Sequence, residues 1–314
     1  MDNRQWFREA GFGIMVHFGL YALLGGEYQG KVMPHIAEWA QSYFRIPNAE
    51  YHRLAEAFNP LYFNADEWVQ TVKKSGAKYL VVTAKHHDGF ALFHSGVSKF
   101  NVVDATPFRR DIIAELATSC QKHDIKLGLY YSQAIDWSHP DGLCFDGNLN
   151  CDEMRWGNDW DFPDAMAKRY ERCFEEKIKP QLRELLTNYG DLCLIWFDTP
   201  MGLERKYSEE LYRMVKEYQP DCLVNSRLGN GFFDYISAGD NVIPEDEQET
   251  LFESPVTLNH SWGYKPTDTD YKSAEEIAAL LARLRTQKVN LLLNVGPDPL
   301  GRFPAAATQV LENL

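Results

Sequence analysis

Short apolar runs alternate with segments of helical periodicity along most of the chain. Runs of strand length, bounded by polar or turn residues, lie at 11–17, 79–84, 126–131, 192–197, 222–225 and 289–294. Apolar residues at helical spacing cover 64–76, 111–123, 162–189 and 208–218, and further helices are expected from Ser273-Ala274-Glu275-Glu276 and after Pro304. Such short runs between helices are typical of strands that are buried on both faces of a parallel sheet.

Two weaker strand candidates, at 234–236 and 256–258, bring the number of strands to about eight. Eight strands that alternate with helices predict an α/β fold, a single (β/α)8-type, TIM-like barrel over residues 1–314 with an irregular second half. A doubly wound sheet is the alternative. It would need a glycine-rich phosphate loop after the first strand, whereas Gly11 and Gly13 precede the end of that strand.

The apolar run 192–197 ends abruptly in Asp198, and Pro200 then breaks the strand. In a parallel barrel, the residue just past the carboxyl end of a strand faces the mouth where active sites lie. Trp196, two residues earlier, lies on the same side of the strand. Asp198 is therefore a candidate catalytic carboxylate, and an aspartate that caps the following loop is the alternative.

The barrel would gather the residues that follow its strands around one mouth. These residues are His17, His86, His87, Tyr131, Asp198, Arg227, Asn294 and the acidic loop 240–249. The long aromatic segment after the first strand has no clear period, and we expect a functional loop there that folds Glu38 and Trp39 over the mouth. Aromatic faces with histidine, carboxylate and arginine groups suit a sugar ring, and a strand-end carboxylate with a second carboxyl group is typical of glycosidases.

Other interpretations of these residues stay open. His86 and His87 would also fit a hydrogen-bonded pair at a strand end. A metal site formed by His17, His86, His87 and Asp198 is a further alternative. Adjacent residues of a strand point to opposite faces, however, which works against both histidines binding one ion. The acidic run 245–249 fits a solvated loop better than a catalytic cluster.

Composition excludes some classes of function. The net charge of −13 and the lack of a basic patch argue against nucleic acid as a partner. No apolar run approaches the about 20 residues of a membrane span, and residues 1–6 lack the apolar core of a signal peptide. We therefore expect a soluble protein, with both a cytoplasmic and a secreted location open. Of the six cysteines, Cys193 and Cys222 are expected in the core, and Cys144 and Cys151 lie in a polar loop where they would be able to pair.

Ten short motifs in the same order resemble the α-L-fucosidases of glycoside hydrolase family 29, from Trp6 to Leu314. They are Trp6-Phe7-Arg8 with Gly11-Phe12-Gly13, Val16-His17-Phe18-Gly19, Glu38-Trp39, Lys85-His86-His87-Asp88-Gly89-Phe90, Tyr130-Tyr131-Ser132 with Asp136-Trp137, Trp196-Phe197-Asp198, Asn225-Ser226-Arg227, Gly239-Asp240-Asn241, Ser261-Trp262-Gly263-Tyr264 and Leu293-Asn294-Val295-Gly296-Pro297. The resemblance implies a retaining exo-hydrolase that releases terminal α-linked L-fucose from glycans, without a metal or cofactor. Many relatives carry a carboxyl-terminal β-sandwich, and none is expected in this chain.

The same resemblance assigns roles to residues. It implies that Asp198 is the nucleophile and that the fucose pocket consists of His17, Glu38, Trp39, His86, His87, Tyr131, Trp196, Arg227 and Trp262. The acid/base falls on Asp240 first, on Glu253 second and on Glu245 third, because this loop varies within the family. Members usually have Trp before the residue that matches Glu253, and here Phe252 stands there. A fucose-binding protein without activity and a retaining galactosidase are the alternatives. The preferred linkage, the aglycone and the oligomeric state stay open.

Overall fold

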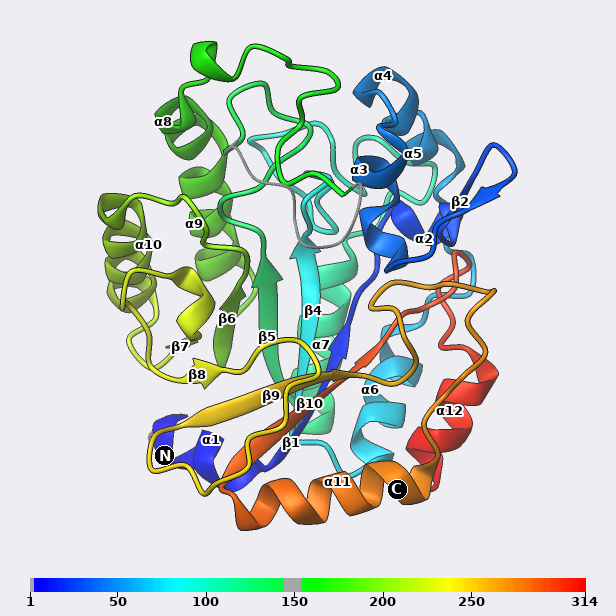
Figure 1. The fold of residues 1–314 in the computed structure, drawn as a ribbon. Coiled ribbons are helices and arrows are strands. Elements are labelled where there is room, and N and C mark those ends of the chain that lie inside the picture. The colour runs from blue at the N-terminus through cyan, green and yellow to red at the C-terminus, as the bar shows by residue number, and fades with distance from the viewer. Residues whose placement is uncertain (1–2, 144–153) are drawn as a thin grey trace.

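The computed structural model describes residues 3–143 and 154–314 (Figure 1). Within them eight parallel strands form one sheet in the order β7-β6-β5-β4-β1-β10-β9-β8. The strands are β1 (Phe12–Val16), β4 (Tyr79–Lys85), β5 (Lys126–Tyr131), β6 (Leu194–Phe197), β7 (Leu223–Val224), β8 (Ile236–Ser237), β9 (Phe252–Thr257) and β10 (Val289–Val295). Six strands lie at the predicted runs, whereas β8 and β9 overlap the two weaker candidates, 234–236 and 256–258, only in part.

The two edge strands, β7 and β8, meet and close the sheet. A single parallel bridge joins Asn225 to Tyr235, and the Val224 carbonyl accepts the backbone N–H of Tyr235 at 3.3 Å. The predicted (β/α)8-type barrel is therefore confirmed, and the doubly wound alternative is wrong.

The second half of the barrel is irregular, as expected. β7 and β8 have two residues each, whereas β4 and β10 have seven. β7 leads to β8 through a 3₁₀ turn, η4 (Ser226–Leu228), and no helix separates β8 from β9. The loops of this half therefore start from short strands, and they carry Arg227 and Asp240.

An outer layer of helices surrounds the sheet (Figure 1). It consists of α6 (Ala65–Lys74), α7 (Ile112–His123), α9 (Lys179–Asn188), α10 (Arg205–Tyr218), α11 (Ala274–Thr286) and α12 (Ala305–Glu312), while α1 (Asn3–Ala10) lies at the amino ends of the strands. Asn64 and Asp111 cap α6 and α7 through their side chains, and Ser273 forms the predicted capping box with Glu276.

The helix expected at 162–189 begins later than predicted. Regular structure starts with α8 (Tyr170–Cys173) and continues through a π-helical turn, η3 (Phe174–Ile178), into α9. Before it stands only the 3₁₀ turn η2 (Ala165–Ala167). The Asp164 side chain accepts the backbone N–H groups of Met166 and Ala167, and this local turn competes with a helix.

The segment after β1, expected as a loop, contains short elements above the carboxyl ends of the strands (Figure 1). They are α2 (Tyr21–Leu24), the hairpin β2 (Glu27–Tyr28) and β3 (Lys31–Val32), the 3₁₀ turn η1 (Ala37–Trp39), α3 (Ala40–Phe44), α4 (Asn48–Tyr51) and α5 (Leu54–Ala57). The 3₁₀ turn η1 brings Glu38 and Trp39 over the barrel.

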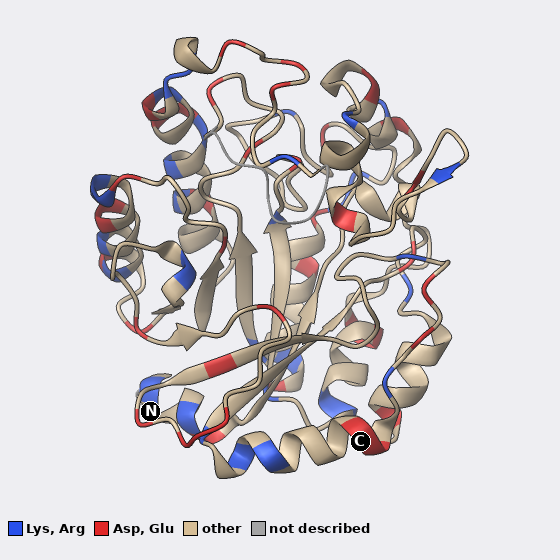
Figure 2. Ribbon diagram, viewed as in Figure 1, with Lys and Arg blue, Asp and Glu red and all other residues tan. Residues whose placement is uncertain are grey.

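Side chains of each strand alternate between the barrel interior and the layer under the helices. Tyr79, Tyr130 and Trp196 belong to the interior cluster, whereas Leu129 and Ile195 pack in the outer cluster. The strands carry few charged residues, and the acidic position within β9 is Glu253 (Figure 2).

The positions predicted for the cysteines can be compared with the structure at Cys193 and Cys222. Cys193 and Cys222 are buried and free, as expected for core residues. Cys144 and Cys151 lie outside the described residues. No helix in the described ranges is long and apolar enough to cross a membrane.

Candidate active site

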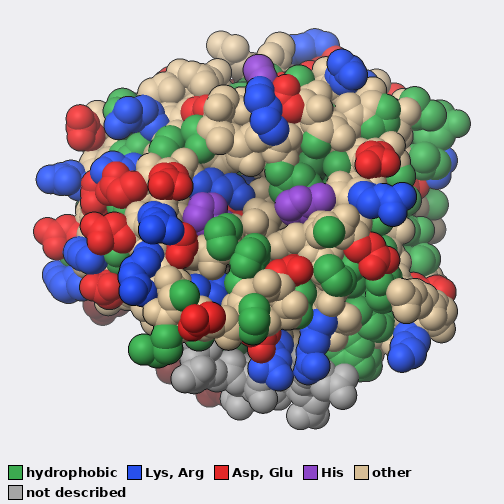
Figure 3. Space-filling model, turned by 90° about the horizontal axis from the view of Figure 1, so that it is seen from above, with side chains coloured by type: hydrophobic (Ala, Val, Ile, Leu, Met, Phe, Trp, Pro, Cys, Tyr) green, Lys and Arg blue, Asp and Glu red, His purple; other side chains and the backbone are tan. Residues whose placement is uncertain are grey.

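A cavity of about 390 Å³ opens at the carboxyl ends of the strands. Its lining consists of His17, Ile36, Glu38, Trp39, His86, Tyr130, Met154, Trp156, Trp196, Asp198, Thr199, Pro200, Met201, Arg227, Gly239, Asp240 and Trp262. Figure 3 views the molecule from this side, with hydrophobic side chains near the middle of the face and charged ones crowded over α8 to α10 at the left edge. The cavity therefore combines aromatic surface with a few charged and imidazole groups.

Asp198 lies at the carboxyl end of β6 and points into this cavity. Its Oδ2 accepts the Tyr130 hydroxyl at 3.0 Å, and its Oδ1 accepts Arg227 at 3.0 Å. The side chain is 15% exposed. Its backbone N–H donates to Gln133 Oε1, and the contacts of the carboxylate are to the side chains of Tyr130 and Arg227 rather than to the backbone N–H groups that a loop cap would bind. The carboxylate is thus held by two donors and stays accessible from the cavity.

Arg227 connects Asp198 to a second carboxylate. One guanidinium nitrogen contacts Asp198, and the other contacts Asp240 Oδ1 at 2.6 Å and the Ala238 carbonyl at 2.7 Å. The guanidinium also lies over the Trp196 ring, 4.7 Å from its centre. Both carboxylates raise the pKa of Arg227 against the effect of burial. Asp198 and Asp240 therefore face one cation at the mouth.

Three rings form a stack along one wall of the cavity. Tyr130 lies between His86, at 5.3 Å and 15°, and Trp196, at 5.5 Å and 18°. The register pairs Tyr130 with Trp196 across β5 and β6, so both side chains enter the barrel. The three rings thus form an aromatic wall that ends in an imidazole.

His17, at the end of β1, is held in one tautomer. Its Nδ1 lies 2.7 Å from Asn294 Oδ1, and the Asn294 amide nitrogen donates to the Trp262 carbonyl, which fixes the amide orientation. Burial lowers the pKa of His17 to about 4. The ring is therefore neutral at pH 7, with Nδ1 as donor and with Nε2 as an acceptor that has no hydrogen-bond partner among the described residues.

His87 is held in the same way. The hydroxyl of Ser132 donates to the Ile135 carbonyl at 2.8 Å, so its oxygen accepts from His87 Nδ1 at 2.7 Å. Burial, and next the Lys85 ammonium, lower the pKa of His87 well below its usual value. Nε2 lies 3.9 Å from Asp198 Oδ2. Because the imidazole is neutral, this contact is not an ion pair.

Glu38 and Trp39 reach the cavity from η1, as predicted. Glu38 is buried and accepts the Gly263 N–H at 2.9 Å, and burial raises its pKa to about 7. Trp39 meets the rings of His87, Trp137 and Trp156 edge to face. A carboxyl group that is partly protonated near pH 7 both donates and accepts hydrogen bonds.

Four predicted catalytic and fucose-pocket residues are not part of the cavity lining, namely His87, Tyr131, Glu253 and Glu245. Tyr131 points to the outer layer, where its hydroxyl donates to Gln181, because side chains alternate along β5 and Tyr130 takes the inward place. Glu253 is fully buried inside the barrel, and its two carboxylate oxygens accept Trp196 Nε1 and the Tyr79 hydroxyl, each at 2.8 Å. Glu245 is exposed on the acidic loop.

The prediction that the side chains of His86 and His87 point to opposite faces is wrong. Both residues lie just past the end of β4, where strand alternation no longer applies, and their ring centres are 4.1 Å apart. Even so, no three His, Cys, Asp or Glu side chains of the described ranges are grouped as metal ligands.

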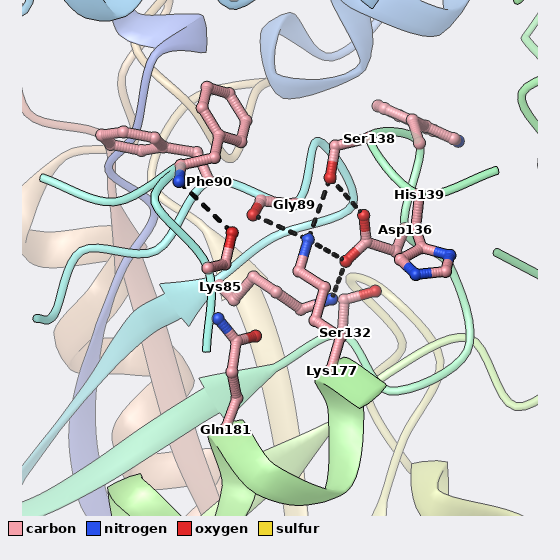
Figure 4. Close-up of polar contacts among 12 residues, drawn as sticks. Lys85, Gly89, Phe90, Ser132, Asp136, Ser138, His139, Lys177 and Gln181 are labelled. Carbon is pink, nitrogen blue, oxygen red and sulfur yellow. Dashed lines mark hydrogen bonds and ion pairs between the residues drawn. The ribbon is translucent and has the colours of Figure 1, made fainter. Parts of the chain in front are cut away.

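Beside these histidines lies a buried ion cluster, defined here as Lys85, Asp136 and Lys177 (Figure 4). Asp136 Oδ2 contacts the two ammonium groups at 3.0 and 2.7 Å, and Oδ1 accepts the Ser138 hydroxyl at 2.6 Å. Burial alone would raise the pKa of Asp136, but the two lysines hold it well below its usual range.

The buried ion cluster fixes the two loops that follow β4 and β5. Lys177 also donates to the carbonyl of Gly89, which has φ +78°, and a Cβ there would collide with Asp136 and Ser138. The Trp137 N–H donates to the His87 carbonyl at 2.7 Å. The cluster therefore supports the backbone that carries His86 and His87.

Several cavity residues were missed from sequence. They are Tyr130, Met154, Trp156, Thr199 and Met201, together with Gln133, which holds the Asp198 backbone. Of these, Tyr130 lay in a motif singled out from the sequence, Tyr130-Tyr131-Ser132, but its inward place depends on the pairing with Trp196. Thr199 adopts φ +52°, an outlier for a β-branched residue that costs about 1–3 kcal/mol.

Known proteins with similar sequences are α-L-fucosidases. The α-L-fucosidase family model matches residues 1–314. A putative α-L-fucosidase of Caenorhabditis elegans is 30% identical over the whole chain, and human plasma α-L-fucosidase is 30% identical over 95% of it. The chain spans 65% and 64% of the length of these two relatives.

Solved structures are more similar still. The Lactobacillus casei α-L-fucosidase AlfC in complex with α-L-fucose is 50% identical with a TM-score of 0.96, and the match covers 100% of this chain and 97% of that one. An α-L-fucosidase of a Vibrio species is 36% identical with a TM-score of 0.92, over 99% of this chain and 54% of that one. These matches confirm the resemblance that the motifs indicated, and the chain belongs to the α-L-fucosidase family.

Proposed function

We propose that the protein hydrolyses terminal α-linked L-fucose from glycans with retention of configuration. The observation that carries this proposal is the accessible Asp198 carboxylate, which shares one guanidinium with Asp240 at the mouth of a cavity. AlfC has been solved with L-fucose, and a mutant of it with Fucα(1,6)GlcNAc, which makes this disaccharide the first substrate to test. The match over 97% of AlfC supports activity in the barrel alone.

In the first step, an Asp198 oxygen attacks the anomeric carbon and the glycosidic C–O bond breaks. Asp240 gives its proton to the leaving oxygen, and a fucosyl ester forms on Asp198. In the second step, the Asp240 carboxylate takes a proton from water, whose oxygen attacks the anomeric carbon and releases Asp198. Retaining enzymes hold their two carboxyl groups about 5–5.5 Å apart, and bridging by one guanidinium is consistent with such a short spacing.

The acid/base must carry a proton when the glycosidic bond breaks. Asp240 forms an ion pair with Arg227 in the present arrangement, so it has to leave that ion pair to donate. Its side chain is 49% exposed, which allows this movement. Glu253, the second candidate, is enclosed below Trp196 with both oxygens occupied. The contacts therefore favour Asp240.

The neutral histidines supply specificity in this proposal. His17 and His86 line the cavity, His17 has Nε2 as an acceptor for a sugar hydroxyl, and Glu38 is able to donate or accept. A site of buried polar groups disfavours sugars that lack the matching hydroxyl, since its groups are then left unpaired. Tyr130 and Trp196 add apolar aromatic surface to the cavity lining on the side of the sugar.

Azide rescue tests the assignment of the acid/base. Asp240→Ala should lose activity on Fucα(1,6)GlcNAc, and added azide should restore turnover of 4-nitrophenyl fucoside with fucosyl azide as product. Glu253→Gln is the matched control and should show no azide effect. Normal turnover of the disaccharide by Asp240→Ala would refute the role of Asp240.

Two further measurements test the activity itself. Proton NMR of the first product should show α-L-fucose, and an initial β-product would refute retention. Hydrolysis of a galactoside at a rate similar to that of the fucoside would indicate a different sugar. Binding of L-fucose without hydrolysis of any fucoside would indicate a binding protein.

A further inference from the structure

The backbone at the carboxyl end of β6 is held by side-chain amides as well as by its neighbouring strands. The pairing of β6 with β7 reaches Ile195 and Val224, and its pairing with β5 reaches Phe197 and Tyr131. Asp198 follows the last of these pairs by one residue. Its buried backbone N–H therefore needs a partner from outside the strand ladder.

Two amide side chains take over where the ladder ends. Asn225 Oδ1 accepts the Phe197 N–H at 3.0 Å, and Asn225 Nδ2 donates to the Phe197 carbonyl at 2.9 Å. Gln133, in the loop after β5, accepts the Asp198 N–H with its Oε1 at 2.9 Å. Both amides are fully buried. The backbone on either side of the Asp198 peptide is thus fixed by side chains with no freedom to follow solvent.

Gln133 also binds the residue that pairs with Asp198. Its Nε2 donates to the Arg227 carbonyl at 3.1 Å, while the Arg227 guanidinium contacts Asp198 Oδ1 at 3.0 Å. Only one orientation of the amide satisfies both bonds, because a flipped amide would turn its nitrogen to the Asp198 N–H and its oxygen to the Arg227 carbonyl. One side chain therefore fixes the backbones of both members of this ion pair.

The loop that carries Gln133 is itself held in place. The Gln133 carbonyl accepts the Tyr170 hydroxyl at 2.7 Å. The preceding residue, Ser132, donates its backbone N–H to the Lys85 carbonyl at 3.0 Å and its hydroxyl to the Ile135 carbonyl at 2.8 Å. The amide of Gln133 is therefore a fixed point against which Asp198 and Arg227 are placed.

We propose that Gln133 is a positioning residue for the nucleophile, which places Asp198 through its backbone N–H and Arg227 through its carbonyl. This role rests on the proposed fucosidase function. Gln133 is not part of the cavity lining, so it acts through Asp198 and Arg227 and not by binding the sugar. A displacement of about 1 Å at reacting atoms costs on the order of 10²-fold in rate.

The test separates attack by Asp198 from binding of the sugar. With 2-deoxy-2-fluoro-α-L-fucosyl fluoride, an Asp198 oxygen bonds to the anomeric carbon, the C–F bond breaks and fluoride leaves, and the resulting ester hydrolyses slowly. The rate constant of inactivation therefore measures the attack, and the inhibition constant of free L-fucose measures the pocket. Gln133→Met removes both hydrogen bonds at nearly constant length. It should lower the inactivation rate constant about 10- to 100-fold and change the inhibition constant less than about 3-fold.

Gln219 provides a matched control near the opposite end of β6. Its Oε1 accepts the Leu192 N–H at 2.8 Å, and its Nε2 donates to the carbonyls of Leu186 and Gly190 at 2.8 and 2.9 Å. Gln219→Met loses bonds of the same kind and should lower the urea midpoint of unfolding. It should leave the inactivation rate constant unchanged, because these bonds lie far from Asp198.

Two results would overturn the role of Gln133. One is a wild-type inactivation rate constant in folded Gln133→Met, and the other is a loss of inactivation that L-fucose inhibition matches. If Gln133→Met does not fold, Gln133→Asn keeps the amide but is one methylene too short for both bonds, and the same two results would decide. Wild-type protein that resists the reagent and hydrolyses no fucoside would instead overturn the fucosidase function itself.

Discussion

The cavity and the buried ion cluster both contain an aspartate that is bound by two cationic or polar side chains, but only the aspartate in the cavity is accessible. In the cluster, Asp136 is enclosed and both of its oxygens are paired within the protein. In the cavity, Asp198 also has two donors, yet its side chain remains 15% exposed, and no residue in the described part of the chain binds Nε2 of His17.

The difference lies in what is left unpaired. A buried charge cluster whose carboxylate oxygens are both paired within the protein holds loops in place and offers no free acceptor to a ligand. A cavity with fixed tautomers and free acceptors retains hydrogen-bonding capacity that a substrate completes. The cluster of Lys85, Asp136 and Lys177 therefore stabilises the backbone, and the cavity retains the groups for chemistry.

The largest expected effect comes from removing the accessible carboxylate. Asp198→Ala should lower kcat for Fucα(1,6)GlcNAc about 10³-fold or more, because the nucleophile is lost. The fold should persist, since Arg227 keeps Asp240 and the Ala238 carbonyl as partners. Steady-state kinetics and thermal unfolding check both parts. Retained turnover, or loss of the folded state, would contradict this distinction between cavity and cluster.

Breaking the cluster should affect stability instead. Lys177→Met leaves Asp136 buried with one lysine and should lower the free energy of unfolding by about 3–5 kcal/mol, measured in urea. Lys179→Met is the matched control, because Lys179 pairs with Glu175 and Glu210 closer to the surface, and it should cost about 1 kcal/mol or less. Equal losses would mean that burial does not distinguish the two sites.

Glu253 sharpens the comparison, since it is buried but paired only with neutral donors. Burial raises its pKa to about 7 from 4.5, so the native state binds a proton that the unfolded state releases between these pH values. The free energy of unfolding should therefore fall as pH rises through this window, by at most about 1.4 kcal/mol per pH unit from this group.

Glu253→Gln should remove this part of the pH slope, although the amide pairs less well with two donors and lowers stability at every pH. Urea titrations from pH 4.5 to 7 measure the slope. Glu56→Gln, at an exposed position, is the control and should keep the wild-type slope. A Glu253→Gln slope equal to the wild-type slope would contradict a protonated, buried Glu253.

Much of the fold was predictable because buried parallel strands leave a clear apolar pattern. The run that ends in Asp198 indicated both β6 and the mouth of the barrel. β7 and β8 were harder, since two-residue strands depend on pairing with distant strands rather than on their own sequence.

The site was less predictable wherever long-range register decides. Tyr130 and Tyr131 are adjacent and both aromatic, and only the pairing with Trp196 decides which one enters the barrel. Glu253 resembles a catalytic acid in sequence, but its partners Tyr79 and Trp196 lie on other strands. No local pattern indicates that the Thr199 hydroxyl lacks a hydrogen-bond partner within residues 3–143 and 154–314.

The contact between β7 and β8 has a consequence for attempts to raise the thermal stability of this protein. One bridge closes the sheet there, and Arg227 reaches across from the β7 side to Ala238 and Asp240 beyond β8. The same guanidinium binds Asp198. The same contacts of Arg227 therefore affect both thermal stability and turnover. Mutations between β7 and β8 that are selected for thermal stability should also alter the rate of catalysis.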